Sequence, residues 1–385
     1  MSVYLDHNAT TPIDARVFEA MLPYLNGNFY GNPSSAHRQG RESQQALELA
    51  REQVAMLVGV QPGQVVFTSG GTEANNLALK GIMAAAVDAG SALIVGATEH
   101  SSVLEPANAL QRMGHSLSHV AVDGDGVVKQ AEFERVLSKH KTALASVMLA
   151  NNETGVVQDV KQLSAIASRQ GVMMHTDAVQ ALGKMKVDFD ALGVTAMSLS
   201  AHKIYGPKGV GALVVEKGLT LQPLLHGGGH EAGLRAGTEN LAGIVGFGAA
   251  ALLMQSGLQQ RTDHCEQLRD RAEQALQAMA GVVIFSQQAR RLPNTIFFAV
   301  DGIEGSTLLM SLDRDGIAVS SGSACASDSG EPTHVLRAMG VDDGLAHGAV
   351  RVSFGSGNTV DDVDRLVASL QRQIESLLKL NSGWA

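Results

Sequence analysis

The 385-residue sequence is poor in cysteine and in aromatic side chains: it has two cysteines and one tryptophan, and aromatics make up 4% of it. Two cysteines are too few for a disulfide framework or a cysteine-rich metal site, and they suit a reducing compartment. Scarce aromatics disfavour the stacking platforms that bind single-stranded nucleic acid. We therefore expect neither a secreted disulfide scaffold nor a nucleic-acid-binding protein.

Positive charge and long apolar runs are also in short supply. The chain has 29 Lys and Arg against 38 Asp and Glu, a net charge of −9, so it lacks a general attraction for nucleic acid or anionic lipid. Its longest apolar stretch, 241–254, is shorter than the roughly 20 residues that cross a bilayer. The first residues lack the pattern of a signal peptide. We expect a cytoplasmic protein with no nucleic-acid and no membrane partner.

What the sequence does contain is a regular alternation of short apolar runs and helical patterns. The runs lie at 64–68, 92–95, 145–150, 172–175 and 196–200. Runs of this kind fit strands that are buried on both faces of a sheet. With helical segments between several of them, they predict an α/β fold built on a mostly parallel sheet with helices on both faces.

The sequence pattern changes beyond residue 258, where charged helical segments and only two apolar strand patterns follow. We predict a large domain over 13–257. A smaller α+β domain is expected from 258–385 together with 1–12, and it would carry a loop at about 320–331. A chain of this length fits two domains at about 150 residues each.

Polar residues at the carboxyl ends of parallel strands are the first candidates for function, because ligands bind there. The run 64–68 is followed by Ser-Gly-Gly-Thr-Glu at the start of a helix. The backbone at Gly71 and Thr72 could approach and bind an anion such as phosphate. The alternative is an ordinary helix cap formed by Ser69 or Thr72.

A carboxylate and a lysine follow two successive strands. Asp177 and Gln180 come after the run 172–175, and Lys203 comes after the run 196–200. This order suits pyridoxal phosphate, in which a lysine forms a Schiff base with the aldehyde and an aspartate keeps the ring nitrogen protonated. The alternative is a surface lysine paired with an acid.

Further candidates each have a structural alternative. His100 could stack on a cofactor ring and move protons, or it could be a cap or loop histidine. An asparagine at 151–152 could contact a cofactor oxygen, or it could form an Asx turn. Arg351, in an apolar strand, could bind a substrate carboxylate or a structural acid.

Cys325 lies in a stretch of small polar residues, where an exposed thiol suggests a role in chemistry. Cys265 sits in a charged helix and is expected to be a bystander. His226 and His230 have no third ligand beside them in the sequence, so no metal site is predicted.

Taken together, these motifs resemble those of the cysteine desulfurases, which are class V aminotransferase-like, fold-type I pyridoxal phosphate enzymes. The resemblance runs from about residue 4 to about 370, and SerSerGlySerAlaCys is typical of the nitrogen-fixation and iron–sulfur-cluster branch. It implies a large cofactor-binding domain with a seven-stranded sheet. It rests on these segments: 4–12, 31–35, 67–76, 151–158, 175–180, 200–211, 235–240 and 320–325.

The resemblance also implies roles for single residues. Lys203 holds the cofactor and later moves the Cα proton, Asp177 pairs with the ring nitrogen, and His100 stacks on the ring. Asn152 and Gln180 contact the ring oxygen or the substrate. The phosphate contacts are implied for Gly71, Thr72, Ser200, His202 and, from the partner subunit of a homodimer, Thr238.

The implied reaction converts L-cysteine to L-alanine. Arg351 binds the substrate carboxylate, and the Cys325 thiolate takes the sulfur as a persulfide for a sulfur-acceptor protein, which would use it for iron–sulfur clusters or other thio-cofactors. A pyridoxal-phosphate-dependent transaminase or β-lyase of a small amino acid is the alternative, and it would not need Cys325. A non-catalytic sulfur-transfer scaffold is a third hypothesis, which the complete set of residues argues against.

Overall fold

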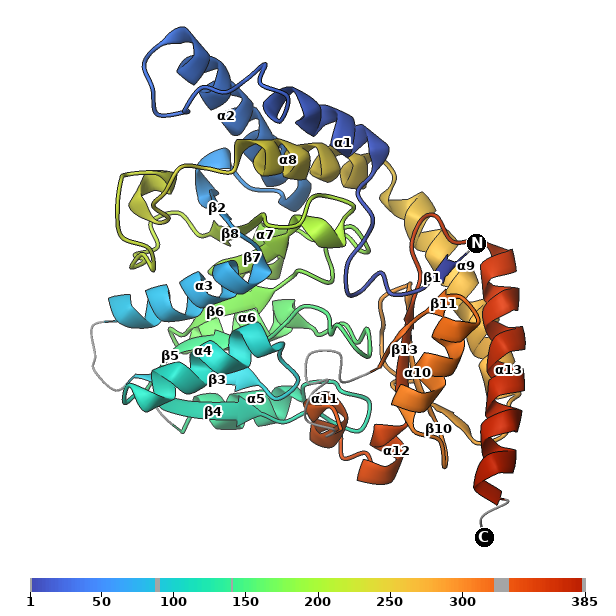
Figure 1. Cartoon of the computed structure of the whole chain (residues 1–385). Helices are drawn as coiled ribbons and strands as arrows, with labels where there is room; N and C mark the ends of the chain where they lie inside the picture. Colours follow the sequence, from blue (N-terminus) through green and yellow to red (C-terminus); the bar gives the residue numbers. More distant parts are fainter. Residues whose placement is uncertain (1, 87–90, 140, 322–331, 383–385) are drawn as a thin grey trace.

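The computed structural model describes residues 2–86, 91–139, 141–321 and 332–382 (Figure 1). Its centre is a seven-stranded sheet in the order β2-β8-β7-β6-β5-β3-β4. β8 is antiparallel to both of its neighbours, and the remaining pairs are parallel. The strands are β2 (Val65–Thr68), β3 (Ala92–Gly96), β4 (Ser116–Val120), β5 (Thr142–Ser146), β6 (Met173–Asp177), β7 (Ala196–Ser200) and β8 (Gly211–Val215).

Helices cover both faces of this sheet, because side chains along each strand alternate between two buried clusters. On β2, for example, Phe67 packs into one cluster and Val66 into the other. One face carries α3 (Gly71–Ala85) and α4 (Ser101–Arg112). The other face carries α1 (Ala15–Met21), α2 (Arg38–Val58), α5 (Gln130–Leu137), α6 (Val160–Arg169), α7 (Phe189–Leu192) and α8 (Leu241–Ser256).

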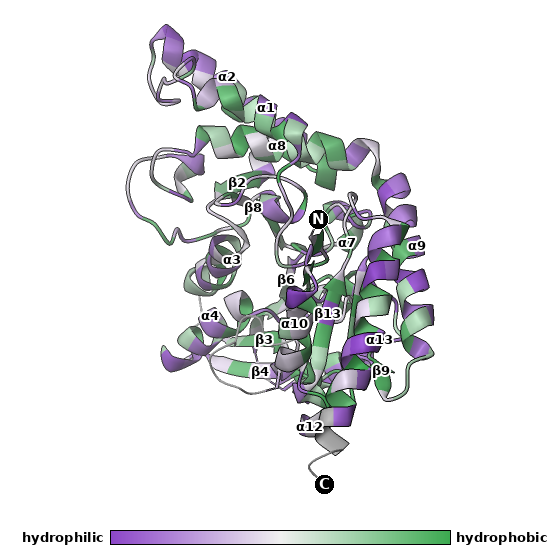
Figure 2. Ribbon diagram, turned by 45° about the vertical axis from the view of Figure 1, so that its right-hand side comes forward, coloured by the Kyte–Doolittle hydropathy of each residue, from purple (hydrophilic) through white to green (hydrophobic). Residues whose placement is uncertain are grey.

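A second, four-stranded antiparallel sheet lies beside the first in the order β12-β13-β10-β9. Its strands are β9 (Val282–Ile284), β10 (Thr295–Val300), β12 (Ser320–Ser321) and β13 (Ala349–Ser353). The helices here are α9 (Leu258–Gln277), α10 (Gly305–Arg314), α11 (His334–Ala338), α12 (Asp343–His347) and α13 (Val360–Ser382). Figure 2 shows hydrophilic faces of α9 and α13 on the outside, as expected for amphipathic helices that cover a core.

The N-terminal segment joins this second region. β1 (Val3–Tyr4) pairs in parallel with β11 (Ile317–Ala318), and Asp6 forms an isolated bridge with Ser353 of β13. Residues 4–10, named here the N-terminal strap, then run from the small sheet towards the large one (Figure 1). The strap therefore connects the two sheets.

The expected α/β class with a mostly parallel, helix-flanked sheet is confirmed. The run at 145–150 was placed too late, since the ladder of β5 spans Thr142–Ser146 and the apolar sequence continues beyond it. The division into domains at 257/258 stays a prediction; at that position α8 and α9 meet at a bend of 76°. In the described residues no single helix is long and apolar enough to cross a membrane, although this bent pair passes the same test jointly.

Candidate active site

A cavity of about 380 Å³ opens at the carboxyl ends of the parallel strands, between the large sheet and the strap. Every predicted site residue other than Thr238 and Cys325 lines it. Asn8, Asn75 and Ser102 line it as well. The structure thus brings together residues that lie far apart in the sequence, while their roles stay predictions.

One end of the cavity is a pocket of backbone and hydroxyl donors at the start of α3. The helix cap is Gly70, and no side chain caps the helix, so the alternative of a Ser69 or Thr72 cap is wrong. A Cβ at Gly71 would lie 2.9 Å from Val179 Cγ2. Ser200 Oγ lies buried here without a hydrogen-bond partner among the described residues. Uncapped helix N–H groups beside an unsatisfied hydroxyl form a site for an anion.

Asp177 is held in the floor of the cavity by two donors. Its Oδ2 accepts from Asn75 Nδ2 at 2.7 Å and its Oδ1 accepts from the Val179 backbone N–H at 2.9 Å. Asn75 Nδ2 also lies 2.8 Å from Ser102 Oγ. The Asp177 side chain is 6% exposed. A carboxylate fixed in this way can face a positively charged ring nitrogen.

His100 forms the helix cap that was its structural alternative, while its role toward a cofactor stays a prediction. It caps α4, with Nδ1 accepting from the Ser102 N–H at 3.1 Å, and Nδ1 also lies 2.7 Å from Ser102 Oγ. Its ring lines the cavity as well. Burial lowers the pKa of His100, and the Asp177 carboxylate opposes that shift. The ring is thus neutral near pH 7, and because Nδ1 accepts from the Ser102 N–H, its hydrogen lies on Nε2.

Lys203 ends the short helical turn that follows β7 and points at the strap. Its Nζ donates to the backbone oxygens of Asn8 at 2.5 Å and Ala9 at 2.7 Å. Neighbouring His202 is within 3.2 Å of Thr10 Oγ1, and burial lowers the pKa of His202 to about 4. The strap therefore supplies the acceptors that hold the lysine amine.

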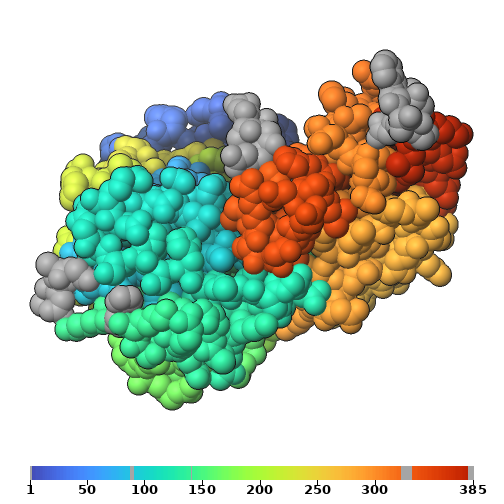
Figure 3. Space-filling view, turned by 90° about the horizontal axis from the view of Figure 1, so that it is seen from below, coloured from blue at the N-terminus to red at the C-terminus, as the bar shows by residue number. Residues whose placement is uncertain are grey.

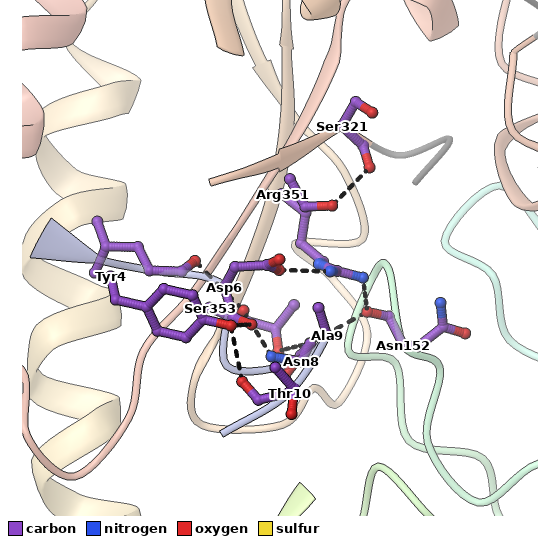
Figure 4. Close-up of polar contacts among 12 residues, drawn as sticks. Tyr4, Asp6, Asn8, Ala9, Thr10, Asn152, Ser321, Arg351 and Ser353 are labelled. Atoms are coloured by element: carbon purple, nitrogen blue, oxygen red, sulfur yellow. Dashed lines mark hydrogen bonds and ion pairs between the residues drawn. The ribbon is translucent and has the colours of Figure 1, made fainter. Parts of the chain in front are cut away.

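Arg351 lies in β13 and reaches the same cavity from the opposite side (Figure 4). Its Nη2 donates to Asp6 Oδ1 at 2.7 Å and its Nη1 to the Asn152 backbone oxygen at 3.0 Å. The guanidinium therefore has a structural acid partner, as the alternative required, and it also faces the cavity. The Arg351 side chain is 5% exposed, so a carboxylate reaching it would be bound with little competing water.

In the loop after β5, Asn151 forms a turn and Asn152 lines the cavity. Asn151 Oδ1 accepts from the backbone N–H groups of Glu153 and Thr154, both at 2.9 Å, which is the Asx turn. Asn152 is the asparagine that lines the cavity. Glu153 is buried, and burial raises the pKa of its carboxyl to about 7.

Cys325 lies outside the described residues, but residues on either side of 322–331 contact Arg351 of the cavity lining or residues next to the lining in the sequence. Ser320 pairs with Arg351 across β12 and β13. On the other side, Thr333 Oγ1 donates to Glu153 Oε2 at 2.6 Å, and His334 Nε2 lies 2.9 Å from the Glu99 backbone oxygen. Figure 3 shows this returning part of the chain, in orange-red, against the part that carries α4 and α5.

Thr238 and Cys265 do not line this cavity. Thr238 is exposed and does not line the cavity, so its predicted contact would need a second subunit. Cys265 is buried, and burial raises the pKa of its thiol to about 11. A thiol in that state is a poor nucleophile, in agreement with a bystander.

Sequence reasoning gave no role to several residues that build the site: Asp6, Asn8, Asn75, Glu99, Ser102 and Lys184. Asn8 and Asn75 stand in the segments 4–12 and 67–76 that carry the resemblance, and this was their only signal. Each has a partner more than a hundred residues away along the chain, Asp177 for Asn75 and Gln180 for Asn8, so spacing could not reveal them.

The fold and the site define a class V aminotransferase: the family described as aminotransferase class-V matches residues 3–366. The chain is 44% identical over 376 residues to the cysteine desulfurase IscS of Dictyoglomus turgidum, covering 97% of this chain and 95% of that protein. It is 41% identical over 380 residues to the cysteine desulfurase IscS of Methanosarcina thermophila, covering 99% and 94%.

A solved NifS-like protein superposes with a TM-score of 0.91 at 39% identity, over 97% of this chain and all of that one. A structure of SspA in complex with cysteine gives a TM-score of 0.81 at 31% identity, over 93% and 100%. The chain belongs to the cysteine desulfurases of the aminotransferase class-V family.

Pyridoxal phosphate is the cofactor of this family, and the residues present fit it. The anion pocket contains the unsatisfied Ser200 hydroxyl, and Asn75 Oδ1 is a second buried atom without a partner among the described residues. Asp177 and Lys203 both face the space between. The cavity therefore offers a phosphate site, a partner for a ring nitrogen and an amine, all within one enclosure.

Proposed function

We propose that the protein is a pyridoxal-phosphate-dependent cysteine desulfurase that converts L-cysteine to L-alanine and keeps the sulfur as a persulfide on Cys325. The observation that carries this proposal is the position of the cavity. It collects an anion pocket, a fixed carboxylate and a lysine amine. One of the residues before the segment with Cys325, Ser320, pairs with Arg351 of the cavity lining, and one of those after it, Thr333, contacts Glu153, the neighbour of Asn152.

The cofactor would be held by residues from the ends of several strands. Gly71, Thr72, Ser200 and His202 would bind the phosphate, and Asp177 would hold the ring nitrogen in its protonated form. When bound, the pyridine ring supplies an electron sink for charge that develops on the substrate Cα. Lys203 Nζ would take the proton from the substrate Cα, because it is the amine that lines the cavity beside Asp177.

Substrate binding and sulfur transfer would occur at the opposite side. Arg351 would bind the carboxylate of L-cysteine, while His100, which carries its hydrogen on Nε2, would donate a proton from that atom. The Cys325 thiolate attacks the substrate sulfur, so an S–S bond forms and the Cβ–S bond breaks. The electron pair left on carbon takes up protons to give alanine, and Cys325 is left as a persulfide.

The chain length between Ser321 and the nucleophile is compatible with this transfer. Cys325 is the fourth residue after Ser321, and four residues of extended chain span at most about 14 Å. Ser321 belongs to the strand that pairs with β13, which carries Arg351. The chain length therefore allows Cys325 to approach the strand that carries Arg351, which supports the proposed transfer.

A single-turnover experiment with L-cysteine tests the proposal. Alanine release and the intact mass of the protein are measured for wild type, Cys325→Ser and, as a matched thiol control, Cys265→Ser. We expect wild type and Cys265→Ser to release alanine and gain one sulfur atom on Cys325, and Cys325→Ser to do neither while keeping its bound cofactor.

Two results would contradict the proposal and favour the alternatives. If Cys325→Ser forms product at the wild-type rate, a transaminase or β-lyase reaction replaces the desulfurase. If the wild-type protein shows no visible absorption after loading with pyridoxal phosphate, a non-catalytic scaffold replaces the enzyme.

We further propose that the protein acts as a homodimer, with Thr238 completing the phosphate site of the partner subunit. Exposed apolar side chains gather in the segment of α1 and the residues after it, including Phe18, Leu25 and Tyr30, which is 74% exposed. A second copy of this chain would cover them. Sedimentation of wild type and Tyr30→Asp should give a dimer and a monomer respectively; a wild-type monomer would contradict this.

The persulfide would be passed to a sulfur-acceptor protein in the cytoplasm. The scarcity of cysteine and the acidic composition support such a compartment. Loss of the labelled sulfur from Cys325 on addition of a thiol-bearing acceptor checks this step, and a persulfide that no thiol acceptor discharges would contradict it.

A further inference from the structure

Lys184 is a partly buried lysine to which the proposed mechanism gives no role. It follows β6 by one helical turn, four residues after Gln180. Its Nζ donates to Gln180 Oε1 at 2.8 Å and to Asn8 Oδ1 at 2.7 Å. The cations Lys203 and Arg351 act on it, opposed only weakly by the Cys265 thiol, and among the described residues no carboxylate forms an ion pair with it.

A lysine in this position is costly for folding. Burial first, and then the charges of Lys203 and Arg351, hold the pKa of Lys184 well below its usual range. An amine without an acid partner is stabilised only by the hydrogen bonds it makes. A methionine would fill much of the same space without that cost. What the lysine adds is its pair of hydrogen bonds to the amide oxygens of Asn8 and Gln180.

The contact with Lys184 determines which way the Gln180 amide faces. As an ammonium, Lys184 donates hydrogen bonds and accepts none, so the Gln180 atom that faces it is Oε1. The Gln180 Nε2 group then donates to the backbone oxygen of Asn8 at 2.9 Å. Gln180 is 5% exposed and lines the cavity, so its second Nε2 hydrogen is available to a bound molecule.

The Asn8 amide does not depend on Lys184 for its orientation, because both its Nδ2 and its Oδ1 have other partners. Its Nδ2 donates to Thr295 Oγ1 at 2.9 Å and to the Asn152 oxygen at 3.2 Å, and its Oδ1 also accepts from Asn294 Nδ2 at 3.1 Å. Asn8 is therefore a fixed anchor for Lys184. In the part of the chain that the structure describes, the Gln180 amide has only Lys184 and Asn8 as partners, so its orientation depends on the lysine.

We propose that Lys184 is a positioning residue, which acts through Gln180 by holding its amide with Nε2 turned towards the cavity. The inference rests on the proposed function, since a donor at this point serves the oxygen of a bound cofactor or substrate. Removal of Lys184 leaves Oε1 without a donor and lets the amide rotate.

The test uses the holoenzyme and compares Lys184→Met with Lys186→Met. Lys186 is a matched control, because its side chain is 83% exposed and lies outside the cavity. Loss of one oriented hydrogen bond predicts that Lys184→Met raises the Kd for pyridoxal phosphate about tenfold and lowers kcat by a similar factor. Thermal unfolding of the apoprotein should change little, and Lys186→Met should resemble wild type throughout.

A double-mutant cycle with Gln180→Leu separates positioning from a general structural effect. If Lys184 acts through Gln180, adding Lys184→Met to Gln180→Leu changes the cofactor Kd by less than about twofold. Effects that multiply in the double variant would overturn the proposal, as would a Lys184→Met protein that matches wild type. Lys184→Gln, which keeps an N–H donor, replaces the methionine variant in the same cycle if the latter does not fold.

These readouts distinguish failure of the inference from failure of the proposed function. Cofactor affinity and its coupling to Gln180 are measured without L-cysteine. If wild type binds pyridoxal phosphate but releases no alanine, the desulfurase proposal fails and the cycle still decides the role of Lys184.

Discussion

The wall of the cavity formed by the large sheet and the wall formed by the N-terminal strap hold their functional groups in different ways. On the sheet side, Asp177, Ser200 and Lys203 follow strand ends or a helical turn, so the ladder of β6 and β7 places them. On the strap side, Asp6 and Asn8 are placed by hydrogen bonds to segments from all over the chain.

This difference has a consequence for how each wall responds to mutation. Backbone hydrogen bonds of the sheet persist when one side chain is changed, so a sheet-side variant should lose chemistry and keep its fold. The strap depends on side-chain contacts: the Tyr4 hydroxyl lies within 3.0 Å of the Asp6 oxygen and 2.9 Å of the Thr10 oxygen, and Asn8 bridges both sheets. A strap-side variant should lose stability and substrate affinity together.

The largest expected effect is on the sheet side, at Lys203. Lys203→Ala removes the amine that moves the proton, and loss of a positioned acid–base group lowers kcat by about 10²- to 10⁴-fold. The apoprotein should unfold at nearly the wild-type temperature, as scanning calorimetry would show. A variant that keeps wild-type turnover would remove the chemical distinction between the two walls.

The next effect concerns Glu153, in the loop that borders both walls. Its carboxyl has a pKa of about 7 in the fold against 4.5 in the free side chain, so the folded state binds the proton more tightly. The stabilising contribution is complete below pH 4.5 and is lost as the pH rises through about 7. It amounts to about 3 kcal/mol, since each pKa unit is worth about 1.4 kcal/mol.

Glu153→Gln tests this by removing the titration. Denaturant unfolding at pH 5 and pH 8 should show that wild type loses stability relative to the variant as the pH rises. Parallel pH profiles for the two proteins would contradict the assignment.

A smaller loss is expected at Asn8, the centre of the strap. Asn8→Ala leaves the buried Thr295 hydroxyl and the Lys184 amine short of partners, which costs about 2 kcal/mol of unfolding free energy. Ser34→Ala, on an exposed loop, is a control for a neutral polar truncation. Equal denaturation midpoints for the Asn8→Ala and Ser34→Ala proteins would show that the strap is not held by its side chains.

The smallest effect is expected at Asp6. Asp6→Asn weakens the charge-assisted bond that orients Arg351, so KM for L-cysteine should rise about fivefold to tenfold with kcat nearly unchanged, in line with about 1 kcal/mol for such a bond. Asp14→Asn, which breaks an exposed ion pair with Arg16, is the matched control. A change in kcat with constant KM would mean that Asp6 serves the chemical step instead.

The same contrast explains what the sequence could predict. Asp177, Ser200 and Lys203 follow apolar runs, and parallel strands bring their carboxyl ends to one edge of a sheet, so local pattern was sufficient. β4 was missed because Ser116–Val120 alternates polar and apolar residues at a sheet edge. β8 was missed because its apolar run follows a glycine-rich turn that resembles a loop.

The strap could not be predicted from local pattern, since Asn8 has its partners at residues 152, 180, 184, 294 and 295. Neighbouring asparagines show the same limit: local pattern placed a functional asparagine at 151–152 without choosing between the pair, and only the resemblance named Asn152. In the structure, Asn151 is used in the Asx turn and Asn152 lines the cavity.

The most direct measurement is to locate the lysine that binds pyridoxal phosphate. The holoenzyme is reduced with borohydride, digested, and the labelled peptide is sequenced by mass spectrometry. We predict that the label lies on Lys203, in the peptide that follows β7. A label on Lys184, which also contacts Asn8, or the absence of any label would contradict the assignment of this cavity as the active site.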